Sequence, residues 1–229
     1  GLTLPLLKYG LPIQPVYFDH MVRYDEYLRK YRYLILSYEF MKPESEEFHH
    51  KLVEWVKQGG TLFYIGKDFD PYNYLQEWWQ KFFCDTPAQH LFAEFGMDKE
   101  PANGCYRIGE GNVLVWNEVP ALLSVNEAIA DKYRNWIREG LKMGGYHWKM
   151  CNYLSVRRDP YIVIASMQES DMGSVYTKEG LFVDLYEDKY PVVERVLVEP
   201  GQEKLLFDLE KIKEDVRIIA TAARIENMV

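Results

Sequence analysis

The sequence lacks several features that would assign a functional class directly. It has 3 cysteines, Cys84, Cys105 and Cys151, and none of them forms a C-x-x-C pair, so no zinc or thioredoxin-type motif is present. An odd number of cysteines does not suggest a disulfide framework. No stretch approaches the ~20 apolar residues of a membrane span, and no secretory signal peptide is visible. The formal net charge of −8 disfavours nucleic acid and anionic membrane surfaces as partners. The compartment stays unknown.

The 5 histidines also show no metal-binding arrangement, since neither H-E-x-x-H nor H-x-H occurs. His49 and His50 are adjacent in a predicted helix, beside its apolar face, and we expect both to face solvent. We therefore predict no metal site and no cofactor.

What the sequence does contain is enough apolar residues for a folded core. Of the 229 residues, 48% are hydrophobic and 15% are aromatic. This length fits one large domain or two modest ones. The many rings favour an aromatic core over a surface that stacks flat ligands or sugars. The chain begins at Gly1 and enters directly into an apolar segment, so we expect a domain excised from a longer protein.

One segment predicts a βαβ unit. Residues 33–36 form a continuous apolar run typical of a strand buried on both faces, and residues 61–65 form another. Between them, Pro43 opens a predicted helix that ends at Gly59 and Gly60. One face of this helix is apolar and carries Phe48, Leu52, Trp55 and Val56. The two strands should be parallel neighbours, with Trp55 buried against them.

The remaining elements predict two domains. Strands are expected at 13–18, 105–108 and 112–116, and helices at 73–83, 86–94 and 124–142. From about residue 146, short β runs replace helical periodicity, at 153–156, 161–167, 181–185, 192–198, 204–207 and 216–220. We therefore predict a flavodoxin-like α/β domain over residues 1–147, with an open parallel sheet and helices on both faces. A small antiparallel β-sandwich domain is predicted over residues 148–229.

Polar and aromatic residues follow two of the predicted strands. In such sheets, ligands bind at the carboxyl ends of the strands, in a crevice where the strand order reverses. The candidate ligand-binding residues are Asp68, Asp70, Tyr72, Asn73, Trp116, Asn117 and Glu118. Carboxylates and amides could bind sugar hydroxyls or a hydrated cation, and a pair such as Asp68 and Glu118 could serve a glycosidase. The favoured alternative is that these residues cap turns and fill the core.

No nucleophile is expected. In an α/β fold it would sit on a turn from strand to helix, but the turns after residues 65 and 116 contain neither serine nor cysteine. The three cysteines are expected to be inert apolar residues. We therefore predict no catalytic residues.

The segment 31–66, with its W-V-x-x-G-G helix end between two apolar strands, resembles a known domain. It is similar to the class I glutamine amidotransferase-like domain of sugar-cleaving enzymes, in particular the trimerisation-type domain of family 42 β-galactosidases. The tail of the chain resembles the small β-sandwich that often follows such domains. True amidotransferases carry a Cys-His-Glu triad, and the cysteine is missing here.

The resemblance implies a non-catalytic accessory module of a larger glycoside hydrolase. Its partners would be the missing catalytic domain of the same polypeptide or further copies of itself, with carbohydrate as a possible ligand. Two alternatives remain open: a free-standing sugar-binding module, and a hydrolase that uses carboxylates at the carboxyl edge of the sheet.

Overall fold

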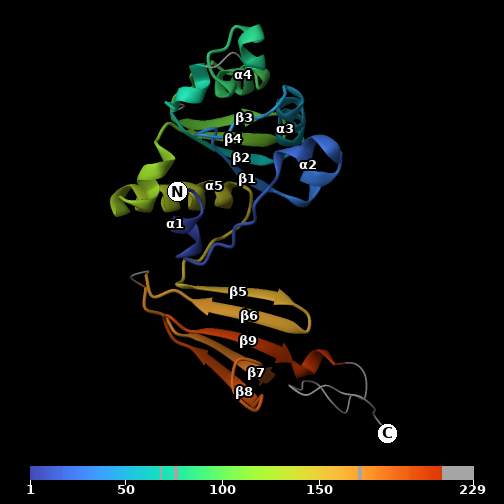
Figure 1. The fold of residues 1–229 in the computed structure, drawn as a ribbon, viewed down its shortest axis with the longest axis vertical. Coiled ribbons are helices and arrows are strands. Elements are labelled where there is room, and N and C mark those ends of the chain that lie inside the picture. The colour runs from blue at the N-terminus through green and yellow to red at the C-terminus, as the bar shows by residue number, and fades with distance from the viewer. Residues whose placement is uncertain (68, 75–76, 170–171, 213–229) are drawn as a thin grey trace. The chain divides into compact units, whose positions relative to one another are not determined.

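A computed structural model describes residues 1–229 except 68, 75–76, 170–171 and 213–229 (Figure 1). The chain divides into two compact units. The first, the α/β unit, comprises residues 1–5 and 13–148, and the second, the β unit, comprises residues 6–12 and 149–229. The division follows the packing of the chain, whereas the domain border predicted between residues 147 and 148 stays a prediction.

The α/β unit contains a four-stranded mixed sheet, sheet A, with the order β1-β2-β4-β3. Its strands are β1 (Tyr33–Leu36), β2 (Thr61–Ile65), β3 (Gly104–Ile108) and β4 (Gly111–Trp116). The first two are parallel neighbours, as predicted, and β4 is parallel to β2. Only β3 is antiparallel, because a tight turn joins it to β4 as a hairpin.

The strand order corrects one expectation. From β1 through β2 to β4 the order advances in one direction, and β3 pairs with the outer side of β4. The described strands therefore contain no point where the order of parallel strands reverses. The prediction of a crevice at such a point was wrong.

Helices cover both faces of sheet A (Figure 1). On one face, α3 (Glu47–Lys57) and α4 (Pro87–Glu94) share a core cluster with Leu62 and Val113 of the sheet. Trp55 of α3 is 8% exposed and donates a hydrogen bond from Nε1 to the Tyr31 carbonyl at 3.1 Å, so its predicted burial is confirmed.

The opposite face is covered by α5 (Glu127–Met143). Gly140 allows this helix to lie close to the sheet, because a Cβ there would stand 2.2 Å from Cε1 of Phe63. The ring of Trp136 meets Phe63 edge-on, with centroids 5.2 Å apart. The side chain of Asn126 caps the helix by accepting a hydrogen bond from the Ile129 N–H.

Several short elements complete the α/β unit, and two predictions for them were wrong. They are α2 (Phe18–Arg23), η1 (Tyr27–Lys30), η2 (Pro71–Tyr74), η3 (Trp78–Phe82) and η4 (Pro120–Ser124), while α1 (Leu4–Leu7) lies across the border of the two units. Residues 13–17 have no regular secondary structure and belong to no sheet, so the predicted strand 13–18 is absent from the described structure. The predicted helix 73–83 consists, where described, of the short turns η2 and η3.

The β unit contains sheet B, which is entirely antiparallel and has the order β5-β6-β9-β7-β8. Its strands are β5 (Tyr153–Arg158), β6 (Tyr161–Ser166), β7 (Tyr176–Asp184), β8 (Val192–Val198) and β9 (Glu203–Asp208), followed by η5 (Leu209–Lys211). The predicted β runs 153–156 and 161–167 correspond to β5 and β6, which pair as a hairpin. The described strands form one sheet, so the sandwich stays a prediction, and the strand expected at 216–220 lies outside the described residues.

An N-terminal segment, residues 6–12, packs within the β unit. The backbone N–H of Cys151 donates to the Tyr9 carbonyl at 3.2 Å. Gly10 has φ +81°, and a Cβ there would stand 2.4 Å from Sγ of Cys151. A residue with a side chain could not occupy this position without displacing its neighbours.

Candidate functional site

Most of the predicted ligand-binding residues gather at the carboxyl edge of sheet A. Ile65 at the end of β2 is the register partner of Trp116 at the end of β4, so the segments after both strands start at the same edge. Asp70, Tyr72 and Asn73 follow β2, and Asn117 and Glu118 follow β4. Asp68 lies outside the described residues.

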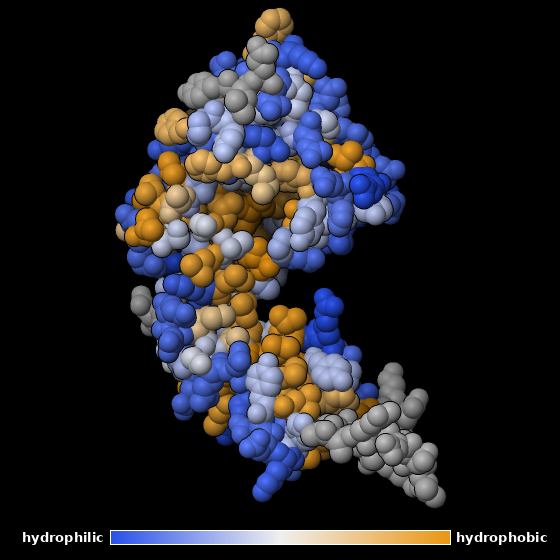
Figure 2. All heavy atoms as spheres, viewed as in Figure 1, coloured by the Kyte–Doolittle hydropathy of each residue, from blue (hydrophilic) through white to orange (hydrophobic). Residues whose placement is uncertain are grey.

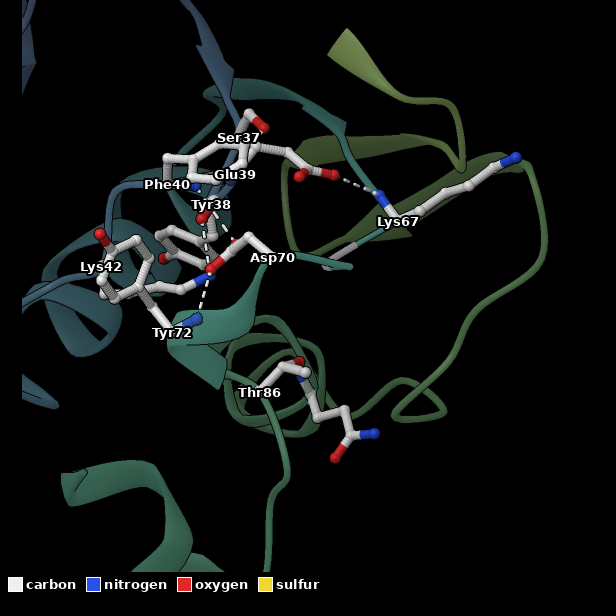
Figure 3. Close-up of polar contacts among 10 residues, drawn as sticks. Ser37, Tyr38, Glu39, Phe40, Lys42, Lys67, Asp70, Tyr72 and Thr86 are labelled. Carbon is white, nitrogen blue, oxygen red and sulfur yellow. Dashed lines mark hydrogen bonds and ion pairs between the residues drawn. The ribbon is translucent and has the colours of Figure 1, made fainter. Parts of the chain in front are cut away.

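Asp70 is buried and is bound entirely by its own chain (Figure 3). Its Oδ2 accepts hydrogen bonds from Lys42 Nζ at 2.6 Å and from the Phe40 N–H at 3.2 Å, while Oδ1 accepts one from the Tyr72 N–H at 3.0 Å. Lys42 Nζ also donates to the Tyr38 carbonyl at 2.7 Å. The pair therefore joins the loop after β1 to the loop after β2, and we call it the edge clamp.

The electrostatics of the edge clamp favour the ionised carboxylate. Burial alone would raise the pKa of Asp70, but the hydrogen bonds from Lys42 and from the Phe40 and Tyr72 N–H groups outweigh it and hold the pKa below its usual range. A carboxylate bound in this way is not available to a cation or to a reacting sugar.

The two loops joined by the edge clamp carry four large apolar side chains that are exposed to solvent. Phe40, Met41, Phe69 and Tyr72 are 70%, 61%, 75% and 51% exposed. They belong to the two clamped loops, and we call them the edge patch. The rings of Phe40 and Tyr72 meet edge-on with centroids 6.4 Å apart.

Phe40 also has an unusual backbone. Its φ of 59° lies in the left-handed region, which costs a residue with a side chain roughly 1–3 kcal/mol. The hydrogen bond from its N–H to the buried Asp70 carboxylate supports this conformation. Strained residues that are held in this way cluster at functional sites, and here the strain accompanies an exposed aromatic ring.

A second link at the same edge uses Glu39, Lys67 and Glu118. The Lys67 N–H donates to Glu39 Oε1 at 3.1 Å (Figure 3), and its ammonium lies 3.6 Å from Glu118 Oε1. Glu118 Oε1 also accepts from the Val119 N–H at 2.9 Å. The Asn117 N–H donates to Asn103 Oδ1 at 2.7 Å. Glu118 and the Asn117 backbone thus connect the segment after β4 to the segments after β2 and before β3, and the turn-capping alternative stays a prediction.

Two predicted residues differ from the rest. Asn73 is buried. Trp116 is half-buried on the α5 face, where its ring lies against Tyr133 and Trp136 with centroids 5.9 and 5.5 Å away. Trp116 therefore belongs to a separate aromatic cluster.

None of the three cysteines directly follows β1, β2 or β4, because Cys84 follows η3, Cys105 is in β3 and Cys151 is in the β unit. Among the described residues, no group of three or more His, Cys, Asp or Glu side chains is placed to hold a metal ion. In the same part of the chain, no helix has the length and apolar character to cross a membrane.

Sequence reasoning missed a buried polar chain of Tyr38, His49 and His90. The Tyr38 hydroxyl is 2.7 Å from Nε2 of His49, and Nδ1 of His49 is 2.8 Å from Nδ1 of His90. Both histidines are buried, so the expectation that His49 faces solvent was wrong, whereas His50 is exposed. Burial lowers the pKa of His49 to about 2, with further lowering by the nearby His90 and His50, and burial also lowers the pKa of His90.

The residues that organise the carboxyl edge, Phe40 and Lys42, were also missed. The available signal was the pair Phe40-Met41, two large apolar residues in a loop before Pro43. Such a pair has no core to fill at a strand end, so it indicates either a surface contact or a ligand. The edge as a whole offers an apolar surface on a fixed backbone, and its described carboxylates are engaged in ion pairs or hydrogen bonds.

Solved structures show the same fold. The chain is similar to Gan42B, a GH42 β-galactosidase from G. stearothermophilus, seen in a catalytic mutant with a TM-score of 0.52 and 14% identity, over 89% of this chain and 35% of that chain. It is similar to a β-galactosidase from Bacillus circulans sp. alkalophilus, with a TM-score of 0.52 and 11% identity, over 89% of this chain and 36% of that chain. The chain thus spans about a third of the length of these proteins.

No protein-family model matches the chain. No curated protein matches it either. At 11–14% identity, the similarity to the galactosidases concerns the fold alone.

Proposed function

We propose that this chain is a non-catalytic accessory module of a larger carbohydrate-active protein of the glycoside hydrolase type. In this proposal, the α/β unit is a flavodoxin-like, glutamine amidotransferase-like domain without the nucleophile, and the β unit is the small sandwich-type domain that follows it. The module packs against the rest of its polypeptide or against further copies of itself.

The edge patch supports this proposal most strongly. Phe40, Met41, Phe69 and Tyr72 are exposed on loops that the edge clamp holds in place. Aromatic residues and methionine are enriched in protein interfaces, and anchors that are already ordered lose little entropy on binding. The fold similarity to part of longer galactosidase chains gives the module a plausible parent protein.

The interface is tested by replacing the edge patch. A chain with Phe40→Ser, Phe69→Ser and Tyr72→Ser should lose self-association in sedimentation velocity, or lose binding to the separately produced remainder of its polypeptide. Phe83→Ser is the control, because Phe83 is 91% exposed and follows η3, outside the two clamped loops. If both forms of binding persist unchanged in the triple variant, the patch is not the interface.

Absence of catalysis is tested separately. The chain should release no ammonia from glutamine and no phenolate from activated esters or nitrophenyl galactosides, because the turns after β2 and β4 contain neither serine nor cysteine and Asp70 is held by Lys42. Turnover that is lost on replacing a cysteine would contradict the accessory role. Turnover that is lost in Glu118→Gln would instead support the carboxylate-dependent hydrolase.

A further inference from the structure

A groove lies beside α5, on the face of sheet A that carries Phe63, and is distinct from the edge patch. Its volume of about 520 Å³ is within the range of small-molecule sites. Cys105 and Leu114, which are register partners in the β3–β4 hairpin, lie on its sheet side. Trp136, Gly140 and Met143 of α5 line its helix side.

The groove follows from the position of α5. Gly140 lets the helix lie directly over Phe63 and Leu114, that is, over β2 and β4. The outer strand β3 is left without a helix on this face, and Cys105 is exposed there. In the space-filling view, hydrophobic residues reach the visible surface in the region where Figure 1 places α5 (Figure 2).

Two indole rings lie at this groove and are held by the core. Trp116 and Trp136 are both half-buried, with centroids 5.5 Å apart and an interplanar angle of 54°. The edge-on contact of Trp136 with Phe63 fixes its orientation. Indole faces of fixed orientation stack well on the apolar C–H face of a sugar ring.

Charged groups of both signs line the same groove. Lys132 and Glu139 are exposed and lie four residues before and three residues after Trp136, so they share its side of the helix. An ionised ligand would meet one group of its own sign, and a purely apolar ligand would desolvate both groups without hydrogen bonds. A neutral ligand with an apolar face and a hydroxyl edge suits the rings, the ammonium donor and the carboxylate acceptor together.

We infer that the groove beside α5 binds a neutral pyranose, as a single sugar or as one unit of an oligosaccharide. Trp116 and Trp136 stack on the ring, and Lys132 and Glu139 bind its hydroxyls. This goes beyond the accessory role, because the groove shares no residue with the edge patch and saccharide binding does not require self-association.

Cys105 supplies a direct readout, because its thiol is exposed in the groove while Cys84 is buried and Cys151 half-buried. The experiment titrates galactose, glucose and β-1,4-galactobiose into the full chain and follows maleimide labelling of each cysteine by peptide mass spectrometry. At least one sugar should slow labelling of Cys105 saturably and leave Cys151 unaffected. Sorbitol, an open-chain polyol without a pyranose face, is the control ligand and should give no protection.

Variants of exposed residues test the same site without disturbing the core. Glu139→Gln and Lys132→Ala should each weaken saccharide binding by about tenfold, as expected for loss of a hydrogen bond to a charged group. Asn135→Ala is the matched control, because Asn135 is exposed on α5 and does not line the groove, and it should have no effect. Cys105→Trp should fill the groove and abolish binding measured by calorimetry, whereas Cys105→Ser should preserve it.

Three results would overturn the inference: no protection by any sugar, equal protection by sorbitol, or binding that survives both Cys105→Trp and Glu139→Gln. Loss of self-association in the edge-patch variant with saccharide binding intact would separate this site from the proposed interface. If the edge-patch variant keeps its self-association, the proposed interface is wrong, but the groove experiment still tests saccharide binding in the same way.

Discussion

The Asp70 carboxylate receives three hydrogen bonds from its own chain, one of them from an ammonium group that is itself largely buried. Its residue type and its place after β2 made it a reasonable ligand candidate. The partner Lys42 lies 28 positions earlier, in the loop after a different strand. No local pattern in the sequence couples the two loops, so only the fold shows that the carboxylate is already engaged.

Replacement of Asp70 should therefore destabilise the chain. In Asp70→Asn, the Lys42 ammonium remains largely buried without its counter-charge, and the free energy of unfolding should fall by about 3 kcal/mol. The matched control is Glu26→Gln in the exposed pair of Arg29 and Glu26, which should change it by less than about 1 kcal/mol. Urea denaturation measures both, and equal effects would show that the edge clamp contributes no more than a surface pair.

The buried histidines predict a pH dependence of stability. The folded chain keeps His49 neutral down to pH about 2, whereas the unfolded chain protonates it near 6.5, and the pKa of His90 is shifted in the same direction. The unfolded state therefore binds more protons below pH 6.5, and the free energy of unfolding should fall there by up to ~1.4 kcal/mol per pH unit for each histidine.

Urea midpoints between pH 7.5 and 4.5 measure this dependence. His49→Gln should flatten the slope in this range, whereas His147→Gln, at an exposed position, should leave it unchanged. The Asp70 carboxyl has a lowered pKa in the folded state, so it adds a further loss only at more acidic pH, where the unfolded chain protonates it before the folded chain does. An identical slope in the two histidine variants would exclude the buried pair as its origin.

Among the elements, α3 shows what the sequence reveals and what it hides. The spacing of Phe48, Leu52, Trp55 and Val56 predicts the buried face, and all four are buried. His49 was predicted to face solvent because it is a polar residue beside that apolar face. It lies four residues before Val53, which is also buried, so the apolar stripe is wider than the sequence suggested. The partner His90 comes from α4, which no periodicity could indicate.

The prediction of a helix over residues 73–83 was wrong for a related reason. Its aromatic spacing resembles a helix, but η2 and η3 are short turns fixed by distant contacts, such as the hydrogen bond from Trp78 Nε1 to the Pro43 carbonyl at 2.8 Å. Phe83, with φ 58°, then ends the segment. By contrast, α4 and the β3–β4 and β5–β6 hairpins follow from local signals, namely a Thr-Pro cap and tight turns.

Trp55 gives a quantitative test of the element packing. Its ring lies over Gly60, where a Cβ would stand 2.5 Å from the indole, and it packs between α3 and the strands. Trp55→Ala should lower the free energy of unfolding by about 3–5 kcal/mol. Val125→Ala, at a position 80% exposed, should change it by less than about 0.5 kcal/mol. A loss below 1 kcal/mol for Trp55→Ala would contradict the packing described here.

For the whole molecule, the attachment of residues 6–12 to the β unit is the feature least visible in the sequence. The sequence marks Gly10 only as a glycine after an apolar segment, whereas its φ of +81° and its closeness to Cys151 exclude a side chain. Gly10→Ala should open the β unit locally, because the added methyl group combines left-handed strain with overlap. Gly145→Ala is the control, with φ +84° and no atom within 4 Å of the added Cβ.

The readout can separate the two units. All 6 tryptophans lie between residues 55 and 148, within the α/β unit, so their fluorescence reports that unit alone. Gly10→Ala should accelerate amide hydrogen exchange in β5 and β6 while the tryptophan fluorescence of the native state stays constant. Unchanged exchange in β5 would show that residues 6–12 are dispensable to the β unit.

The attachment of Tyr9 to Cys151 has a consequence for synthesis on the ribosome. Residues 6–12 leave the exit tunnel before residues 13–148, but Cys151 and sheet B, with which they pack, are translated only after residues 13–148. At typical elongation rates this interval is on the order of ten seconds. Leu6 and Leu11 are buried in the folded protein. During that time the rest of the β unit to which they belong has not yet been synthesised. The nascent chain therefore exposes this apolar segment to chaperones until translation has passed β5.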